Sequence, residues 1–247
     1  MKKFIYLTIF LSLFSITSTF TQKIEYASLL IPAELKENAN AVVRDNLLQI
    51  TIEDVDKMIV YKREVVTVLN KVGNVDARIG ASYDEDTKIT ELSAYIYDAF
   101  GKEIKKYKER DFLDVSAVSG GTLYSDARYM YVDYKPISYP YTLVFESEYK
   151  TGTTGFIPSW FPINGYHISV EKSTYQIDNP KEIPWRKKEI NFKDFGIQNE
   201  STVGRIKYTT TNQQALDYEN NAIHYREILP KAKISLSSFY LKGVQGE

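Results

Sequence analysis

Cysteine and histidine, which often serve as catalytic nucleophile and base, are absent or scarce in this chain. The chain of 247 residues has no cysteine and only two histidines, His167 and His224. Without cysteine, this chain can supply no thiolate nucleophile, no disulfide framework, no iron–sulfur cluster and no Cys/His zinc site. A serine hydrolase needs a histidine beside a positioned serine, and no G-x-S-x-G turn occurs to present one. Both histidines fall on the polar side of predicted strands, which favours surface roles.

The carboxylates do not form a convincing catalytic pair or metal site. A glycosidase needs two acids several ångströms apart, one of them with a raised pKa. The densest acidic cluster, Asp84-Glu85-Asp86, falls between two predicted strands, as a solvated turn would. It is too short for a calcium loop. The pair Gly120-Gly121 lacks the spacing and the Lys of a phosphate loop, which favours a flexible connection. We therefore predict no catalytic residue, no metal and no cofactor.

Aromatic residues are the most informative side chains. Seven of the twenty tyrosines lie within one short stretch, closely followed by Trp160 and Phe161. Flat aromatic faces can stack on sugars or hold peptides at a low entropic cost. Tyrosine is also common in strands, so a protein core is the alternative interpretation. The candidate ligand-contacting residues are Tyr129, Tyr131 and Trp160. The seven tyrosines are Tyr124, Tyr129, Tyr131, Tyr134, Tyr139, Tyr141 and Tyr149.

The elements that must position these side chains are strands. Leu48, Ile50 and Ile52 alternate with polar residues, and further segments repeat this period of two. Short polar turns separate the segments, which predicts an all-β fold: an antiparallel β-sandwich of about ten strands. One short N-terminal helix is expected just after Pro32, and 151–165 is predicted to be a long loop or a sub-boundary. The clearest predicted strands cover 58–69, 88–98, 102–107, 141–149, 166–171, 204–210, 222–229 and 232–241.

Residues 1–21 are typical of a signal peptide. Lys2 and Lys3 precede an apolar run over 4–16, which is too short to span a bilayer comfortably. An uncleaved membrane anchor is the alternative. Cleavage would leave 22–247 as one domain. Of the 31 basic residues of the whole chain, Lys2 and Lys3 would be removed, so 29 basic and 32 acidic residues would remain. This balance excludes nucleic-acid binding through bulk positive charge. We expect export to the periplasm or cell exterior, with no membrane span after signal removal.

Several stretches in order along the chain resemble the transglutaminase-associated domain of unknown function found in secreted bacterial proteins. In that family the domain precedes a transglutaminase-like domain with a Cys-His-Asp catalytic set. This chain has no cysteine, so no catalytic residue carries over, and the family assigns no binding residues to this domain. The resembling stretches are 31–44, 66–70, 83–84, 98–104, 111–112, 123–128, 139–141 and 157–160.

The resemblance implies a non-catalytic secreted accessory or binding domain. Such a domain would bind a peptide, protein or glycan, or position a neighbouring transglutaminase-like domain. The alternative is an N-terminal fragment of a transglutaminase-like cysteine peptidase or acyltransferase, with its catalytic domain beyond Glu247. A self-contained glycosidase is a third possibility, which rests on carboxylates that the sequence does not place.

Overall fold

The computed structural model describes residues 24–117, 126–220 and 223–247. Strands account for 51% of the residues and helices for 12%, which confirms the predicted all-β class. The predicted signal segment, Gly120-Gly121 and Tyr124 lie outside the described residues. In the part of the chain that is described, no helix has the length and apolarity to cross a membrane.

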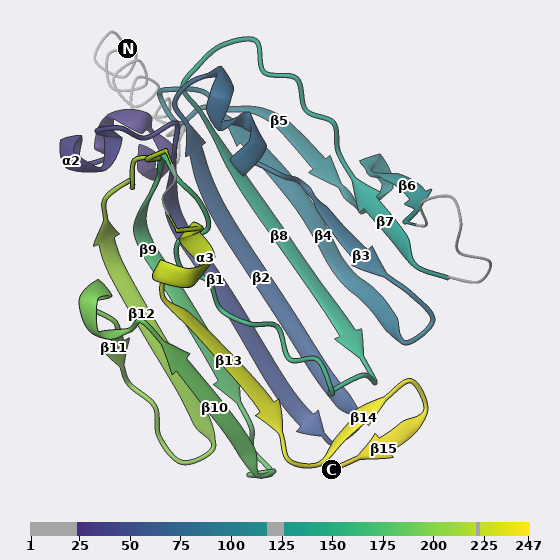
Figure 1. The fold of residues 1–247 in the computed structure, drawn as a ribbon. Helices are drawn as coiled ribbons and strands as arrows, with labels where there is room; N and C mark the ends of the chain where they lie inside the picture. Colours follow the sequence, from purple (N-terminus) through teal and green to yellow (C-terminus); the bar gives the residue numbers. More distant parts are fainter. Residues whose placement is uncertain (1–23, 118–125, 221–222) are drawn as a thin grey trace, which may run out of the picture.

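An eight-stranded sheet forms the back of the molecule (Figure 1). Its strand order is β11-β12-β9-β1-β2-β8-β4-β5. The pair β9 and β1 inside this sheet is parallel, whereas its other strand pairs are antiparallel, as the predicted antiparallel sandwich requires. A parallel pair needs a long connection, and here the chain builds four other strands of this sheet between β1 and β9. The strands are β1 (Ala41–Asp54), β2 (Lys57–Val68), β4 (Thr87–Tyr97), β5 (Glu103–Lys108), β8 (Tyr141–Thr151), β9 (Ile168–Asp178), β11 (Gln198–Asn199) and β12 (Arg205–Gln213).

Two smaller sheets lie over one face of this large sheet, which we call the inner face (Figure 1). One is three-stranded, in the order β3-β7-β6, and the other is the pair β10-β13. A hairpin of β14 and β15 ends the chain. The second layer of the sandwich is therefore divided into separate pieces. Its strands are β3 (Gly80–Tyr83), β6 (Leu113–Ser116), β7 (Arg128–Tyr131), β10 (Trp185–Ile190), β13 (Lys231–Leu236), β14 (Phe239–Leu241) and β15 (Val244–Gly246).

The helical segments are short. The predicted N-terminal helix is α2 (Ala33–Lys36), with Pro32 at its N-cap, and its Leu35 packs on Val42 of the outer face. The strand predicted over 222–229 is wrong, because α3 (Tyr225–Ile228) occupies that segment. The strand predicted over 232–241 is in fact β13 and β14, with a break between them. The 3-10 helices are η1 (Ile24–Tyr26), η2 (Ser28–Leu30), η3 (Lys71–Asp76), η4 (Glu109–Asp111) and η5 (Lys193–Phe195).

Each small sheet covers its own hydrophobic core. Met130 of β7 packs on a cluster that includes Val66 and Leu143 of the large sheet. Ile234 of β13 packs on a second cluster that includes Ile50 and Val60. The large sheet therefore buries the two ends of its inner face separately, and the region between the two cores has a different composition.

Candidate binding cleft

A band of polar residues crosses the inner face between the two cores. On β2, Met58, Val60, Val66 and Val68 are buried, and strand alternation places Lys62 and Glu64 on the same face. Across the neighbouring strands, Glu64 lies opposite Asn46 of β1 and Phe145 of β8. Asn46 is in turn aligned with Ser173 of β9. We call Asn46, Lys62, Glu64 and Ser173 the polar band.

A β-bulge in β1 positions Asn46. The register of β1 against β2 shifts between Val43 and Asp45. A bulge adds one residue to a strand and so reverses which side chains face each side beyond it. Val43 and Asn46 therefore both face inward. Asp45 faces outward, where its carboxylate pairs with Arg63 at 2.6 Å.

At the β9 end, the polar band is closed over by the second layer. Ser173 accepts a hydrogen bond of 2.9 Å from the indole Nε1 of Trp160. Trp160 is only 1% exposed, and its ring stacks on Tyr175 and Tyr208 at interplanar angles of 3° and 22°. The structure therefore places this candidate ligand-contacting residue in the core, where its burial leaves no open ring face.

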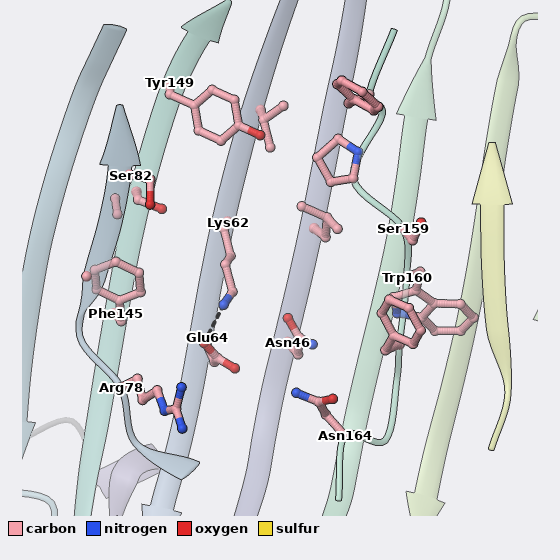
Figure 2. A pocket seen from close by; sticks show the side chains of 18 of the residues that line it. Asn46, Lys62, Glu64, Arg78, Ser82, Phe145, Tyr149, Ser159, Trp160 and Asn164 are labelled. Atoms are coloured by element: carbon pink, nitrogen blue, oxygen red, sulfur yellow. Dashed lines mark ion pairs between the residues drawn. The ribbon is translucent and has the colours of Figure 1, made fainter. Parts of the chain in front are cut away.

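At the centre, the polar band is the floor of a cleft of about 1000 Å³ (Figure 2). Lys62 Nζ and Glu64 Oε2 form an ion pair at 2.7 Å. The side-chain oxygen of Asn46 is shielded from solvent and accepts no hydrogen bond from the part of the chain that the structure describes. Figure 2 shows Asn164 extending toward Asn46 from the opposite side. A buried polar atom without a partner costs free energy, and no described residue donates a hydrogen bond to this oxygen.

The walls of the cleft come from β3 on one side and the segment 156–164 on the other (Figure 2). Burial raises the pKa of the Asp76 carboxyl on the first wall, and the charge of Arg78 partly opposes this shift. Burial also raises the pKa of Tyr149 on the floor to about 12, so its phenol stays neutral. On the other wall, Phe156 and Phe161 are 72% and 37% exposed. The cleft therefore combines neutral donors and acceptors, charges and apolar rings.

Neither histidine lies beside a catalytic partner in the cleft. His167 precedes β9 at a φ of 56°, and its Nδ1 lies 3.1 Å from the carbonyl oxygen of Asn38. His224 is the N-cap of α3 and accepts a hydrogen bond from the Arg226 amide at 3.2 Å. Both were predicted as strand residues. Instead, His167 lies just before a strand and His224 lies just before a short helix. Over the described ranges, no group of three or more His, Asp or Glu residues could hold a metal ion.

The acidic cluster forms a turn between β3 and β4, as predicted. The Asp86 amide donates a 3.1 Å hydrogen bond to the Asp84 carboxylate, and Asp84 forms a bridge with Thr87. The Asp84 carboxylate thus satisfies a backbone amide of its own turn.

Tyr129 and Tyr131 lie together, away from Trp160. They are half-buried on β7, the middle strand of its sheet, with ring centroids 5.8 Å apart and planes 12° apart. Both line a second cavity of about 520 Å³, next to Tyr134, Tyr139 and Tyr141. The structure therefore groups two of the three predicted candidates in a tyrosine-rich cavity.

Sequence reasoning missed Asn46, Lys62 and Glu64. The signal was present, because each shares the strand parity of apolar neighbours: Leu48 and Ile50 for Asn46, and Val60 and Val66 for the other two. A polar residue on the apolar parity of a strand is unexpected for a simple core position.

The comparison with family models identifies this architecture. A model described as a domain of unknown function with solved structures, DUF3857, matches residues 55–217. The chain belongs to the DUF3857 family. No protein with a curated description matches it.

A solved structure shares the fold at low sequence identity, and two others match with TM-scores below 0.5. A "putative protease" from Parabacteroides distasonis is 15% identical, with a TM-score of 0.63, over 81% of this chain and 41% of that chain. The chain thus spans about two fifths of that protein. A "putative nutrient binding protein" from Legionella pneumophila is 9% identical, with a TM-score of 0.33, over 80% and 68%. An M1 zinc metallopeptidase from Deinococcus radiodurans is 7% identical, with a TM-score of 0.31, over 79% and 42%.

Proposed function

We propose that this chain is an exported, non-catalytic binding domain whose cleft holds a segment of polypeptide. The observation that carries the proposal is the partnerless oxygen of Asn46 beside the Lys62–Glu64 ion pair, at the centre of a core-facing sheet surface. Apolar side chains at these positions would have extended the two cores. Polar groups there are costly unless something else satisfies them.

A polypeptide suits the mixed character of the cleft. Its main chain offers a donor and an acceptor at each residue, which complement the amides of Asn46 and Asn164. Its side chains can cover Phe156 and Phe161, which are exposed on the wall. The volume of about 1000 Å³ lies at the upper end of the range for small-molecule sites and leaves room for several residues.

The non-catalytic part of the proposal rests on chemistry. Acyl transfer of the transglutaminase kind uses a cysteine thiolate activated by histidine, and the chain has no cysteine. The resemblance to transglutaminase-associated domains adds a role. The bound polypeptide would be a partner protein or part of a neighbouring transglutaminase-like domain that this domain positions.

The test is to select peptides that bind the full chain from a display library of short random peptides. Asn46→Leu should weaken binding of the selected peptide about ten-fold or more, because a buried contact is lost. Gln49→Leu is the matched control, since Gln49 lies on the outward parity of the same strand. The affinity of this control variant for the selected peptide should stay unchanged. Failure to select any peptide, or equal affinities for the two variants, would count against the cleft.

A second candidate is the N-terminal part of a transglutaminase-like cysteine peptidase or acyltransferase. It is favoured by the shared fold with the "putative protease", of which this chain covers 41%. The nucleophile would then come from residues beyond Glu247. Reading the gene past this point tests it directly. The chain alone should show no peptidase, amidase or acyl-transfer activity, and any turnover would contradict the non-catalytic proposal.

Export is the third part of the proposal and has its own test. Lys2, Lys3 and the apolar run that follows support removal of residues 1–21. N-terminal sequencing of the exported protein should begin near Gln22. Recovery of the chain in the cytoplasm with Met1 intact would contradict export.

A further inference from the structure

The wall of the cleft formed by β3 is the free edge of a sheet. β3 lies at one end of the order β3-β7-β6, and β7 is its only strand partner among the described residues. Gly80, Ala81, Ser82 and Tyr83 all line the cleft in succession. Side chains alternate between the two faces of a strand, so a run of consecutive lining residues means that the strand borders the cleft with its edge.

The register shows which backbone groups are unpaired. The Val132 amide donates to the Ile79 carbonyl at 3.1 Å, and Gly80 is the next residue in register, opposite Tyr131. Hydrogen-bonded and non-hydrogen-bonded pairs alternate along an antiparallel ladder. Gly80 and Ser82 therefore turn their N–H and C=O groups away from β7, toward the cleft.

The opposite wall is also strand-like. Trp160 and Ala232 of β13 exchange two backbone hydrogen bonds, of 2.9 and 3.0 Å. The segment around Trp160 thus extends the β10-β13 sheet by one short strand toward the cleft. The second layer of the sandwich ends on one side at β3 and on the other at this segment. The polar band on the large sheet forms the floor of the gap between them (Figure 2).

We propose that an extended polypeptide enters the cleft as a β-strand, pairs with the Gly80 and Ser82 backbone of β3, and so fills the gap in the second layer. This inference rests on the proposed function and specifies its binding mode. An added strand satisfies the unpaired donors and acceptors of an edge, a recurrent mode of peptide recognition. Alternate side chains of the bound strand face Asn46 and the Lys62–Glu64 pair, which selects polar residues at those positions.

The Tyr129 ring packs closely against the edge strand at Gly80. A Cβ atom built on Gly80 would lie 2.2 Å from the Tyr129 hydroxyl oxygen, so the ring occupies the space that a side chain at position 80 would need. The aromatic residue therefore covers β3 beside its free edge. In this view Tyr129 is a positioning residue for the strand.

A proline variant tests the edge directly. Ser82→Pro removes an N–H that points away from β7, so it breaks no bond of the β3–β7 ladder, and proline is tolerated on edge strands. Ser82→Ala is the matched control, because it keeps the N–H. Peptides selected on the full chain should bind Ser82→Pro about ten-fold more weakly than Ser82→Ala. Equal affinities in two variants with equal melting temperatures would overturn the edge pairing.

Backbone N-methylation of the selected peptide provides a test that leaves the protein unchanged. Methylation at every second residue should abolish binding, while methylation at the residues between should have little effect, since one side of the bound strand faces β3. Uniform sensitivity, or none, would overturn strand pairing and leave polypeptide binding intact. If no peptide binds at all, the proposed function fails as well. Concentration-dependent dimers that Ser82→Pro dissociates would assign the edge to a second copy and contradict the proposal.

Discussion

The two faces of the large sheet differ in how far the hydrogen bonds of their polar side chains are satisfied. On the outer face, Arg63 of β2 contacts Asp45 at 2.6 Å, Glu146 at 3.1 Å and the Tyr26 hydroxyl at 3.0 Å. On the inner face, the adjacent Lys62 forms an ion pair with Glu64, and the side-chain oxygen of Asn46 has no hydrogen-bond partner among the described residues. Consecutive residues of one strand thus belong to a satisfied network and to an incomplete one.

This difference separates stability from binding. A polar network that is fully satisfied inside the protein adds rigidity and needs nothing further. A network with a spare acceptor beside a cleft gains most when a ligand completes it. The network around Arg63 is therefore expected to contribute to the free energy of unfolding. The polar side chains of the inner face are expected to contribute to the affinity for a ligand.

The largest expected effect is a loss of stability at the β9 end of the polar band, where Trp160 covers Ser173. Trp160→Ala should lower the free energy of unfolding by about 4 kcal/mol, because it empties a large buried volume and leaves Ser173 without its donor. Urea unfolding followed by circular dichroism measures this. A small loss of stability with weakened peptide binding would instead return Trp160 to the ligand site.

The next effect compares two neighbours on β2. Arg63→Met should cost about 2 kcal/mol, since it strands the partly buried Asp45 and Glu146 carboxylates. Lys62→Met should change stability by no more than about 0.5 kcal/mol, because its ion pair is solvated, with the Lys62 side chain 42% exposed. Equal losses in the two variants would erase the distinction between the faces.

The tyrosine pair is expected to have a smaller effect. Tyr131→Ala should cost about 1 kcal/mol, mainly through lost stacking on Tyr129. Melting temperature and affinity for selected peptides and for oligosaccharides should be measured together. Reduced stability with unchanged affinities indicates a packing role. An unchanged melting temperature with weaker binding would support the ligand platform that the sequence suggested.

The smallest effect concerns pH. Burial raises the pKa of Asp76 on the cleft wall above its unfolded value of 3.8. The folded state therefore binds this proton more tightly, and the stabilisation is complete below pH 3.8 and is lost as pH rises through the folded pKa. Asp76→Asn should raise the melting temperature slightly at pH 7 and leave it unchanged near pH 3. A lower melting temperature at pH 7 would mean that the carboxylate has a stabilising partner.

The sequence predicts the positions of the strands better than it predicts which strands pair. Period-two alternation locates β2, β4 and β8 to within about a residue or two, because each strand buries one face. The parallel contact of β1 with β9 leaves no local signal, since it joins residues more than a hundred positions apart. The strand predicted over 222–229 fails for a different reason: Tyr225–Ile228 form a short helix, and His224 caps that helix through its side chain.

To recognise the cleft requires both the strand parity in the sequence and the packing of the two layers. Lys62 and Glu64 can be recognised as polar residues on an apolar parity. Asn46 shares the parity of Leu48 and Ile50, although the bulge after Val43 interrupts that parity toward the start of the strand. That all three side chains line a cleft depends on the gap in the second layer. A gap between two small sheets is a property of tertiary packing. The tyrosines are easy to recognise in the sequence because they are numerous. The two tyrosine candidates, Tyr129 and Tyr131, line the second cavity and not the cleft.

The position of β1 in the sheet order has a practical consequence for truncation. The family match begins at residue 55, whereas β1 ends at Asp54 and lies between β9 and β2 in the middle of the large sheet. A fragment cut to residues 55–217 would split the sheet, expose two long strand edges and also lose β13. Such edges favour aggregation. The cooperative folding unit is therefore expected to extend from before Ala41 to at least Leu236, beyond the region that sequence similarity outlines.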